Sequence, residues 1–203
     1  MGNASALIDY TDRNGSATVV LKQPHRRYLD EMFRLKCAPD LLVAGLFPNA
    51  KEWTESVGAY RAAGLKLRCV AELSDGAVTA FVVGDGSTPR TGAMLACRTA
   101  WTVHSIDPRA REKAWPIQRL TVHRCRVEDF RLEEPAGRSV VIAVHSHADL
   151  GRAVASVERC ATVVGVVAIP CCEPQRLATE PDDDYHDWGI HSPERRVLVW
   201  RRA

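Results

Sequence analysis

Continuous apolar segments separated by polar turns dominate the second half of the chain. Val, Ile, Ala and Leu run on in these segments without the polar alternation of a half-exposed strand, so we expect strands covered on both faces, as in a parallel sheet. Each segment also has the length of a strand. The strands predicted in this way are residues 77–83, 101–106, 117–123, 139–145, 162–169 and 195–200.

Two segments between these strands have helical spacing, at residues 91–100 and 148–160. Strands that alternate with helices are typical of a doubly wound α/β sheet. We therefore predict a Rossmann-like, mostly parallel sheet with helices on both faces. The acidic stretch at 180–187 is expected to be a solvated loop.

The first part of the chain has a different pattern. Residues 1–20 carry turn-forming residues around small apolar patches and are expected to be partly flexible, whereas 23–37 and 48–64 have helical spacing. We therefore divide the chain into a mainly helical N-terminal extension or lid at 1–70 and a sheet domain at 71–203, which pack as one compact unit.

Composition excludes some classes of protein. The 203 residues have a formal net charge of +2, so no strong overall field indicates a nucleic-acid or membrane partner, although arginine clusters recur along the chain. The seven cysteines are an odd number without regular spacing, which predicts reduced thiols and a cytoplasmic location. No apolar run approaches the roughly 18 residues that cross a membrane.

A glycine turn follows the first predicted strand of the sheet. Gly84, Asp85 and Gly86 allow the tight turn and the close backbone approach that a nucleotide-like ligand needs. The third glycine of the dinucleotide fingerprint is replaced by Pro89, and no lysine completes a P-loop. The ligand is therefore not expected to present a diphosphate to the following helix.

Acidic residues follow the next two strands. Asp107 ends the second strand, where a carboxylate can accept hydrogen bonds from both hydroxyls of a ribose. Glu128 or Asp129, after the third strand, can reach the amino group of an adenine. S-adenosylmethionine contains a ribose and an adenine but no diphosphate, and is the ligand that we predict.

The three segments "VVGDG", "SIDP" and "VEDF" resemble the cofactor motifs of class I S-adenosylmethionine-dependent methyltransferases, over about residues 77–200. The resemblance implies a seven-stranded sheet and a cofactor site made by Gly84, Asp85, Gly86, Asp107 and either Glu128 or Asp129, with Arg90 as a candidate for the methionine carboxylate. A nicotinamide or flavin enzyme, or a sheet whose glycine turn binds nothing, remains the alternative.

Two clusters follow the fourth and fifth strands, "HSHAD" at 145–149 and "PCC" at 170–172. If these strands are neighbours, His145, His147 and Cys171 lie beside the donor methyl group, and we predict that they are catalytic. A histidine can remove the proton of a hydroxyl or amine acceptor, and a cysteine can attack covalently.

Two other interpretations of these clusters stay open. A histidine with Cys171 and Cys172 can bind zinc, but adjacent cysteines are poorer ligands than a C-x-x-C pair, so no metal is predicted. Alternatively, the cysteines are small buried hydrophobic residues, as free cysteine commonly is.

The acceptor has three candidate classes. The histidine-bearing segment and "IPCC" together resemble a methyltransferase subgroup that includes tRNA 2′-O-methylating enzymes, and this favours RNA or a nucleotide-like group. A small-molecule acceptor under an N-terminal helical lid is the alternative, with Trp53, Tyr60 and Trp188 as candidate lining. The third possibility is a binding module without catalysis.

Overall fold

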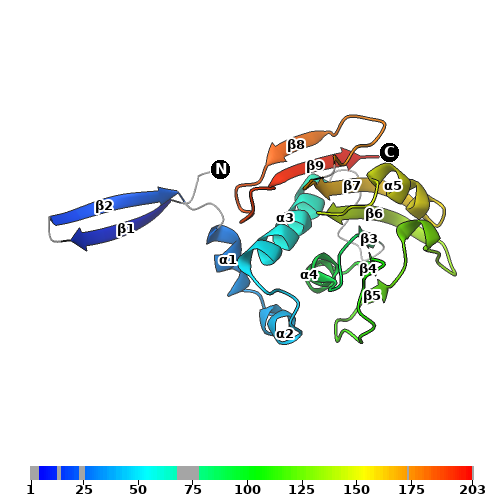
Figure 1. The fold of residues 1–203 in the computed structure, drawn as a ribbon, viewed down its shortest axis with the longest axis horizontal. Helices are drawn as coiled ribbons and strands as arrows, with labels where there is room; N and C mark the ends of the chain where they lie inside the picture. The colour runs from blue at the N-terminus through cyan, green and yellow to red at the C-terminus, as the bar shows by residue number, and fades with distance from the viewer. Residues whose placement is uncertain (1–4, 13–14, 23–25, 68–77, 173, 203) are drawn as a thin grey trace.

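The computed structural model describes residues 5–12, 15–22, 26–67, 78–172 and 174–202. Its first elements are β1 (Ser5–Asp12) and β2 (Gly15–Lys22), an antiparallel hairpin that forms a sheet of its own (Figure 1). The sequence did not predict these two strands. Both segments contain β-branched residues, which favour strands, and Ile8 pairs with Val19 in the hairpin.

The second sheet has seven strands in the order β5-β4-β3-β6-β7-β9-β8. Strands β3 to β7 are parallel to one another, whereas β9 runs antiparallel to both β7 and β8. The mostly parallel sheet predicted from the sequence is therefore confirmed. The strands are β3 (Thr79–Val83), β4 (Thr102–Ile106), β5 (Leu120–His123), β6 (Ala136–Val144), β7 (Ala161–Ile169), β8 (Asp183–His186) and β9 (Arg196–Arg201).

The predicted helices are present with shifted ends. The helices are α1 (Arg26–Met32), α2 (Ala38–Val43), α3 (Ala50–Lys66), α4 (Arg90–Arg98) and α5 (Leu150–Glu158), with a short 3-10 helix η1 (Val127–Asp129). The sequence did not predict α2. Asn49 caps α3 by accepting a hydrogen bond from the Glu52 amide at 3.0 Å, and Asp149 caps α5 in the same way through the Arg152 amide at 2.7 Å. No helix in the described ranges is both long and apolar enough to cross a membrane.

Helices cover both faces of the large sheet (Figure 1). Along β3, Ala80 and Val82 belong to one hydrophobic core, with buried residues of α3 and α4, whereas Phe81 and Val83 belong to another core, with residues of α5 and η1. The doubly wound fold is therefore confirmed, and α3 is one of its covering helices. The predicted domain boundary at residue 70 lies outside the described residues.

The acidic stretch at 180–187 was expected to be a loop, and this expectation is wrong because it contains the edge strand β8. Basic groups compensate its acidic side chains. Asp184 accepts hydrogen bonds from the Arg196 guanidinium at 2.6 and 2.9 Å, and Asp183 accepts one from the Lys66 ammonium at 3.1 Å. Arg201 also pairs with Asp183. A charged run that looks solvated in the sequence can therefore form an edge strand.

The topological switch point of the sheet lies between β3 and β6, which are hydrogen-bonded neighbours. From β3 the chain proceeds to β4 and β5 on one side, and then returns to β6 on the other. In open α/β sheets, ligands bind outside the carboxyl ends of the strands at such a switch point. The residues that follow β3 and β6 are therefore expected to form a ligand-binding site.

Candidate functional site

The turn after β3 requires glycine at two positions. Gly84 and Gly86 have φ values of 71° and 80°, in the left-handed region that side chains with a Cβ disfavour. A Cβ on Gly84 would also lie 2.3 Å from the hydroxyl of Ser146, in the loop after β6. The same addition at Gly86 meets no atom within 4 Å. Gly84 is therefore fixed by close packing, while Gly86 faces open space.

Asp85 anchors the turn to the helix that follows it. Its buried carboxylate accepts hydrogen bonds from the amides of Thr91 and Gly92 and from the hydroxyl of Ser105, each at 2.9 Å. Burial raises the pKa of this carboxyl to about 6, against the opposing effect of these hydrogen bonds. Since three donors of the fold bind its two oxygens, Asp85 supports the turn, and it also lines the smaller cavity described below.

Asp107 joins the glycine turn to the end of β4. One oxygen accepts a hydrogen bond from the Gly86 amide at 2.8 Å and the other from the Arg109 amide at 2.7 Å. The residue is 3% exposed, but it lines a cavity. A carboxylate oxygen can accept more than one hydrogen bond, so Asp107 is oriented by the backbone and can still bind hydroxyl groups.

The cavity beside Asp107 has a volume of about 590 Å³ and lies at the carboxyl ends of the parallel strands. Val83, Ile106 and Val127 give it apolar walls, and Glu128 adds a carboxylate. The sequence left the choice between Glu128 and Asp129 open. Glu128 lines this cavity, whereas Asp129 is exposed and is not part of its lining.

A smaller cavity of about 190 Å³ lies beside the large one, and both are lined by Gly84, Arg109, His145 and His147. Its remaining lining is mainly charged. Groups of both signs face it from α3 and from the start of α4, namely Lys51, Glu52, Glu55 and Arg90.

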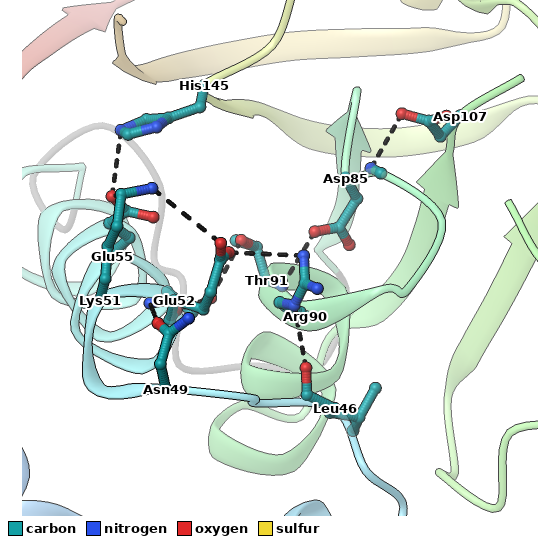
Figure 2. A network of polar contacts seen from close by, with 12 residues as sticks. Leu46, Asn49, Lys51, Glu52, Glu55, Asp85, Arg90, Thr91, Asp107 and His145 are labelled. Carbon is teal, nitrogen blue, oxygen red and sulfur yellow. Dashed lines mark hydrogen bonds and ion pairs between the residues drawn. The ribbon is translucent and has the colours of Figure 1, made fainter. Parts of the chain in front are cut away.

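Arg90 is held in place at the edge of the smaller cavity. Its Nε donates to the carbonyl of Leu46 at 2.9 Å, and its Nη1 lies 3.4 Å from Glu52 Oε2 (Figure 2). The sequence suggested this arginine for the methionine carboxylate, and the structure puts its guanidinium in a fixed position beside the glycine turn.

His145 follows β6 and faces a buried acid on α3. Its Nε2 lies 3.4 Å from Glu55 Oε1, and the two side chains point toward one another in Figure 2. Burial raises the pKa of Glu55, although the neighbouring His145 and Lys51 lower it. The Lys51 ammonium is 3.2 Å from the same Glu55 oxygen. His145 lines both cavities, whereas Glu55 and Lys51 line the smaller one.

His147 lies with the two cysteines that follow β7. The Sγ of Cys172 is 3.7 Å from His147 Nδ1 and 3.5 Å from the Sγ of Cys171. The two predicted clusters are therefore adjacent, as expected for neighbouring strands, but the side chains do not all converge on one point. His145 turns to Glu55, and Asp149 serves as the cap of α5.

Sequence reasoning missed three residues that support this site. Glu55 is one acid among several in an amphipathic helix, and nothing local marks it. Ser146 packs against Gly84, and the buried Gln175 donates from Nε2 to the carbonyl of Ser146 at 2.9 Å. These contacts join segments that are distant in the sequence, so no local pattern could reveal them.

No known protein family matches the sequence, and no curated protein matches it. Several solved structures are similar to this chain in fold. The similarity to a mutant of MtNAS covers 89% of this chain and 75% of that protein at 12% identity, with a TM-score of 0.46. The same mutant in complex with S-adenosylmethionine has a TM-score of 0.45. DesVI from Streptomyces venezuelae gives 16% identity over 80% of this chain and 64% of its own, with a TM-score of 0.41.

A putative type II methyltransferase from Anaeromyxobacter dehalogenans is 24% identical over 51% of this chain and 46% of its own, with a TM-score of 0.33. The strand order is what defines the fold of this chain. A seven-stranded, mostly parallel sheet that is covered by helices on both faces is the fold implied by the resemblance to class I methyltransferases.

Proposed function

We propose that this chain binds S-adenosylmethionine and transfers its methyl group to RNA or a nucleotide-like acceptor. The observation that carries the proposal is the position of Asp107. Its carboxylate is oriented by the Gly86 amide and lines a cavity at the switch point of the sheet. An acid in this position beside a glycine turn suits the ribose of an adenosine.

The large cavity suits the adenosine of the cofactor. The hydroxyls of the ribose would donate to Asp107, and the adenine would lie between the apolar side chains of Ile106 and Val127. Glu128 would accept a hydrogen bond from the amino group of the adenine. These contacts combine apolar walls with a few polar groups that fix orientation, as small-molecule sites commonly do.

The small cavity suits the amino acid end of the cofactor. This end carries a carboxylate and an ammonium, and the cavity offers Arg90 and Lys51 together with Glu52 and Glu55. Arginine is well suited to bind a carboxylate through two parallel hydrogen bonds. Since both cavities are lined by Gly84, one extended ligand can occupy the two.

The reacting sulfonium would then lie where the two cavities meet, beside His145. Transfer breaks the bond between the sulfonium sulfur and the methyl carbon, and the acceptor atom forms the new bond as the sulfur keeps the electron pair. The acceptor also loses a proton. The imidazole of His145, which lies 3.4 Å from Glu55, is our candidate for receiving that proton. His147, which also lines the large cavity, and Cys171, close to His147, are further candidates.

Three exposed arginines beside the large cavity suit an anionic acceptor, although three acids, Asp107, Glu128 and Asp149, line the same cavity. Arg109, Arg126 and Arg152 line this cavity and are exposed. Exposed arginines at the mouth of a site can bind the phosphates of a nucleic acid even when the net charge of the chain is small.

The aromatic residues suggested for a small-molecule pocket line neither of the two cavities. Trp53 is 1% exposed in the core and donates from its indole to the Tyr28 carbonyl at 3.1 Å. Tyr60 packs under Arg98, and Trp188 is 58% exposed. This arrangement gives no support to a common aromatic pocket, so RNA is the acceptor class that we favour.

The acceptor is tested by transfer of a labelled methyl group from S-adenosylmethionine to unmodified RNA. We expect labelled RNA with the wild-type chain, and weaker RNA binding after Arg126→Glu and Arg152→Glu. The affinity for RNA should also fall steeply as the salt concentration rises. For single-stranded RNA, the logarithm of the binding constant falls by about 0.7 per tenfold increase in salt for each phosphate bound. Normal cofactor binding without RNA labelling, or RNA binding that ignores both substitutions, would contradict the proposed acceptor.

A further inference from the structure

Three side chains that can bind a metal lie together beyond the carboxyl ends of β6 and β7, and one of them, His147, lines the large cavity. They are His147, from the loop after β6, and Cys171 and Cys172, from the bend after β7. The nitrogen and sulfur atoms that they offer all lie within 4.8 Å of one another. The loops are held together because the His145 amide donates to the Ile169 carbonyl at 2.9 Å, at the end of the paired strands β6 and β7.

Two of the three separations within this cluster match those of a tetrahedral site, and the third, between His147 and Cys171, is at most 4.8 Å. Zinc bonds of about 2.3 Å to sulfur and about 2.1 Å to nitrogen place neighbouring ligand atoms about 3.5 to 3.8 Å apart. The two Sγ atoms are separated by 3.5 Å, and Cys172 Sγ is 3.7 Å from His147 Nδ1. A small adjustment of side-chain rotation would be enough to complete such a geometry.

The sequence argued against a metal because successive side chains of an extended segment diverge. That argument does not hold at this position. Cys171 and Cys172 lie in a bend beyond the end of β7, so both sulfurs point to the same side. Gln175, a few residues later, donates to the carbonyls of Ser146 and Ala148 at 2.9 and 3.4 Å and fixes the cysteine loop against the histidine loop.

The cluster is also accessible to an ion from solvent. His147 and Cys172 are exposed and Cys171 is half-buried. Within the described ranges, these three residues are the protein ligands of the cluster, and Asp149 nearby serves as a helix cap. A site with three protein ligands leaves the fourth position of zinc for water or another small ligand.

We propose that His147, Cys171 and Cys172 bind one zinc ion, or a similar thiophilic divalent cation, in a tetrahedral site with an open fourth position. The site does not rest on the proposed function, since it requires neither S-adenosylmethionine nor an acceptor. Zinc suits this donor set because its ligands are thiolates and neutral imidazoles.

Cobalt(II) is the probe that tests the site, because it adopts the same geometry and its thiolate complexes absorb light. The full chain, reduced and freed of metal, is titrated with cobalt(II) under anaerobic conditions. We expect one equivalent to bind, with a sulfur-to-cobalt charge-transfer band and the visible bands of a tetrahedral complex. Zinc should then abolish these bands by displacing the cobalt.

Variants assign the ligands. Cys171→Ser and Cys172→Ser should each lower the charge-transfer absorbance by about half or abolish binding, and His147→Gln should weaken binding at least about tenfold, as loss of a metal ligand or of its supporting contacts does. Cys160→Ser is the matched control, because the Cys160 thiol donates to the Val157 carbonyl in another part of the chain. It should leave the titration unchanged.

Circular dichroism establishes that each variant is folded, and calorimetry with S-adenosylmethionine tests the cofactor site separately. A folded, reduced wild-type chain that gives no charge-transfer band would overturn the metal site. So would a band that survives both cysteine substitutions. Either result would leave the proposed function intact, whereas loss of cofactor binding alone would leave the metal site intact.

Discussion

Glu55 and His145 connect the N-terminal part of the chain to the end of β6. The imidazole Nε2 of His145 lies 3.4 Å from the buried carboxylate of Glu55, which belongs to α3. The helix that the sequence presented as an extension or lid therefore contributes a residue to the wall of the site. Helix α3 also packs in the core against the sheet.

This contact predicts separate effects on binding and on turnover. We expect His145→Ala to lower the rate of methyl transfer by roughly a hundredfold or more, as loss of a general base does. Glu55→Gln, which keeps the shape but removes the negative charge 3.4 Å from the ring, should lower kcat by a smaller factor, with little effect on the KM for RNA. Steady-state assays with labelled cofactor measure both constants. Equal kcat values for wild type and His145→Ala would exclude this histidine from the chemistry.

Arg90 is expected to distinguish between two ligands. S-adenosylmethionine carries the amino acid end that the small cavity suits, whereas 5′-methylthioadenosine lacks it. Loss of a charge-assisted hydrogen bond of about 1.5 to 3 kcal/mol predicts that Arg90→Ala weakens S-adenosylmethionine binding by roughly 10- to 100-fold. The affinity for 5′-methylthioadenosine should change little, and calorimetry with both ligands measures the difference. If both affinities fall equally, Arg90 acts through the fold instead of through the amino acid end.

The two glycines of the turn after β3 differ in their tolerance of a side chain. Gly84→Ala and Gly86→Ala each place a Cβ in the left-handed region, at a cost of about 1 to 2 kcal/mol. Gly84→Ala should be the more destabilising, because its Cβ would lie 2.3 Å from the Ser146 hydroxyl. Denaturant unfolding measures both, and Ser146→Gly should partly rescue Gly84→Ala while having no such effect with Gly86→Ala. Equal losses without rescue would refute the packing argument.

The stability of the chain should depend on pH through Asp85. Burial raises the pKa of this carboxyl from its ordinary 3.8 to about 6, so the folded state keeps a proton at pH values at which the unfolded state has lost it. The contribution of Asp85 to the free energy of unfolding is therefore full below pH 3.8 and falls as pH rises to about 6, by roughly 3 kcal/mol in total.

Asp85→Asn removes this titration and gives the comparison. Urea unfolding at pH 4, 5, 6 and 7 should show that wild type loses stability relative to the variant as pH rises. If the free energies of unfolding of the two proteins change in parallel with pH, or if wild type gains stability relative to the variant toward pH 7, the raised pKa of the Asp85 carboxyl is contradicted.

The strands at the centre of the sheet were predictable because their environment is uniform. Segments such as Ala161–Ile169 are buried on both faces by helices, so an unbroken apolar run is enough to identify them. The edge strand β8 was not predictable in this way. Its Asp183 and Asp184 are compensated by Lys66, Arg196 and Arg201, which are distant in the sequence.

The candidate site was predictable in part for a related reason. Gly84, Gly86 and Asp107 follow directly after strands, where the chain must turn at the ligand edge of a parallel sheet. The partners of the other residues depend on tertiary packing. Nothing near His145 in the sequence indicates that it faces Glu55, and nothing near Cys171 indicates that a bend aligns its sulfur with that of Cys172.

The most direct test of the account is calorimetry of the full chain with S-adenosylmethionine, for wild type, Asp107→Asn and the matched control Asp129→Asn. Asp129 is an exposed acid outside the cavity lining, so it controls for the loss of a charge. We predict one cofactor per wild-type chain, affinity at least about tenfold weaker for folded Asp107→Asn, and unchanged affinity for Asp129→Asn. A folded wild-type chain that binds no S-adenosylmethionine, or variants that bind it equally well, would contradict the account.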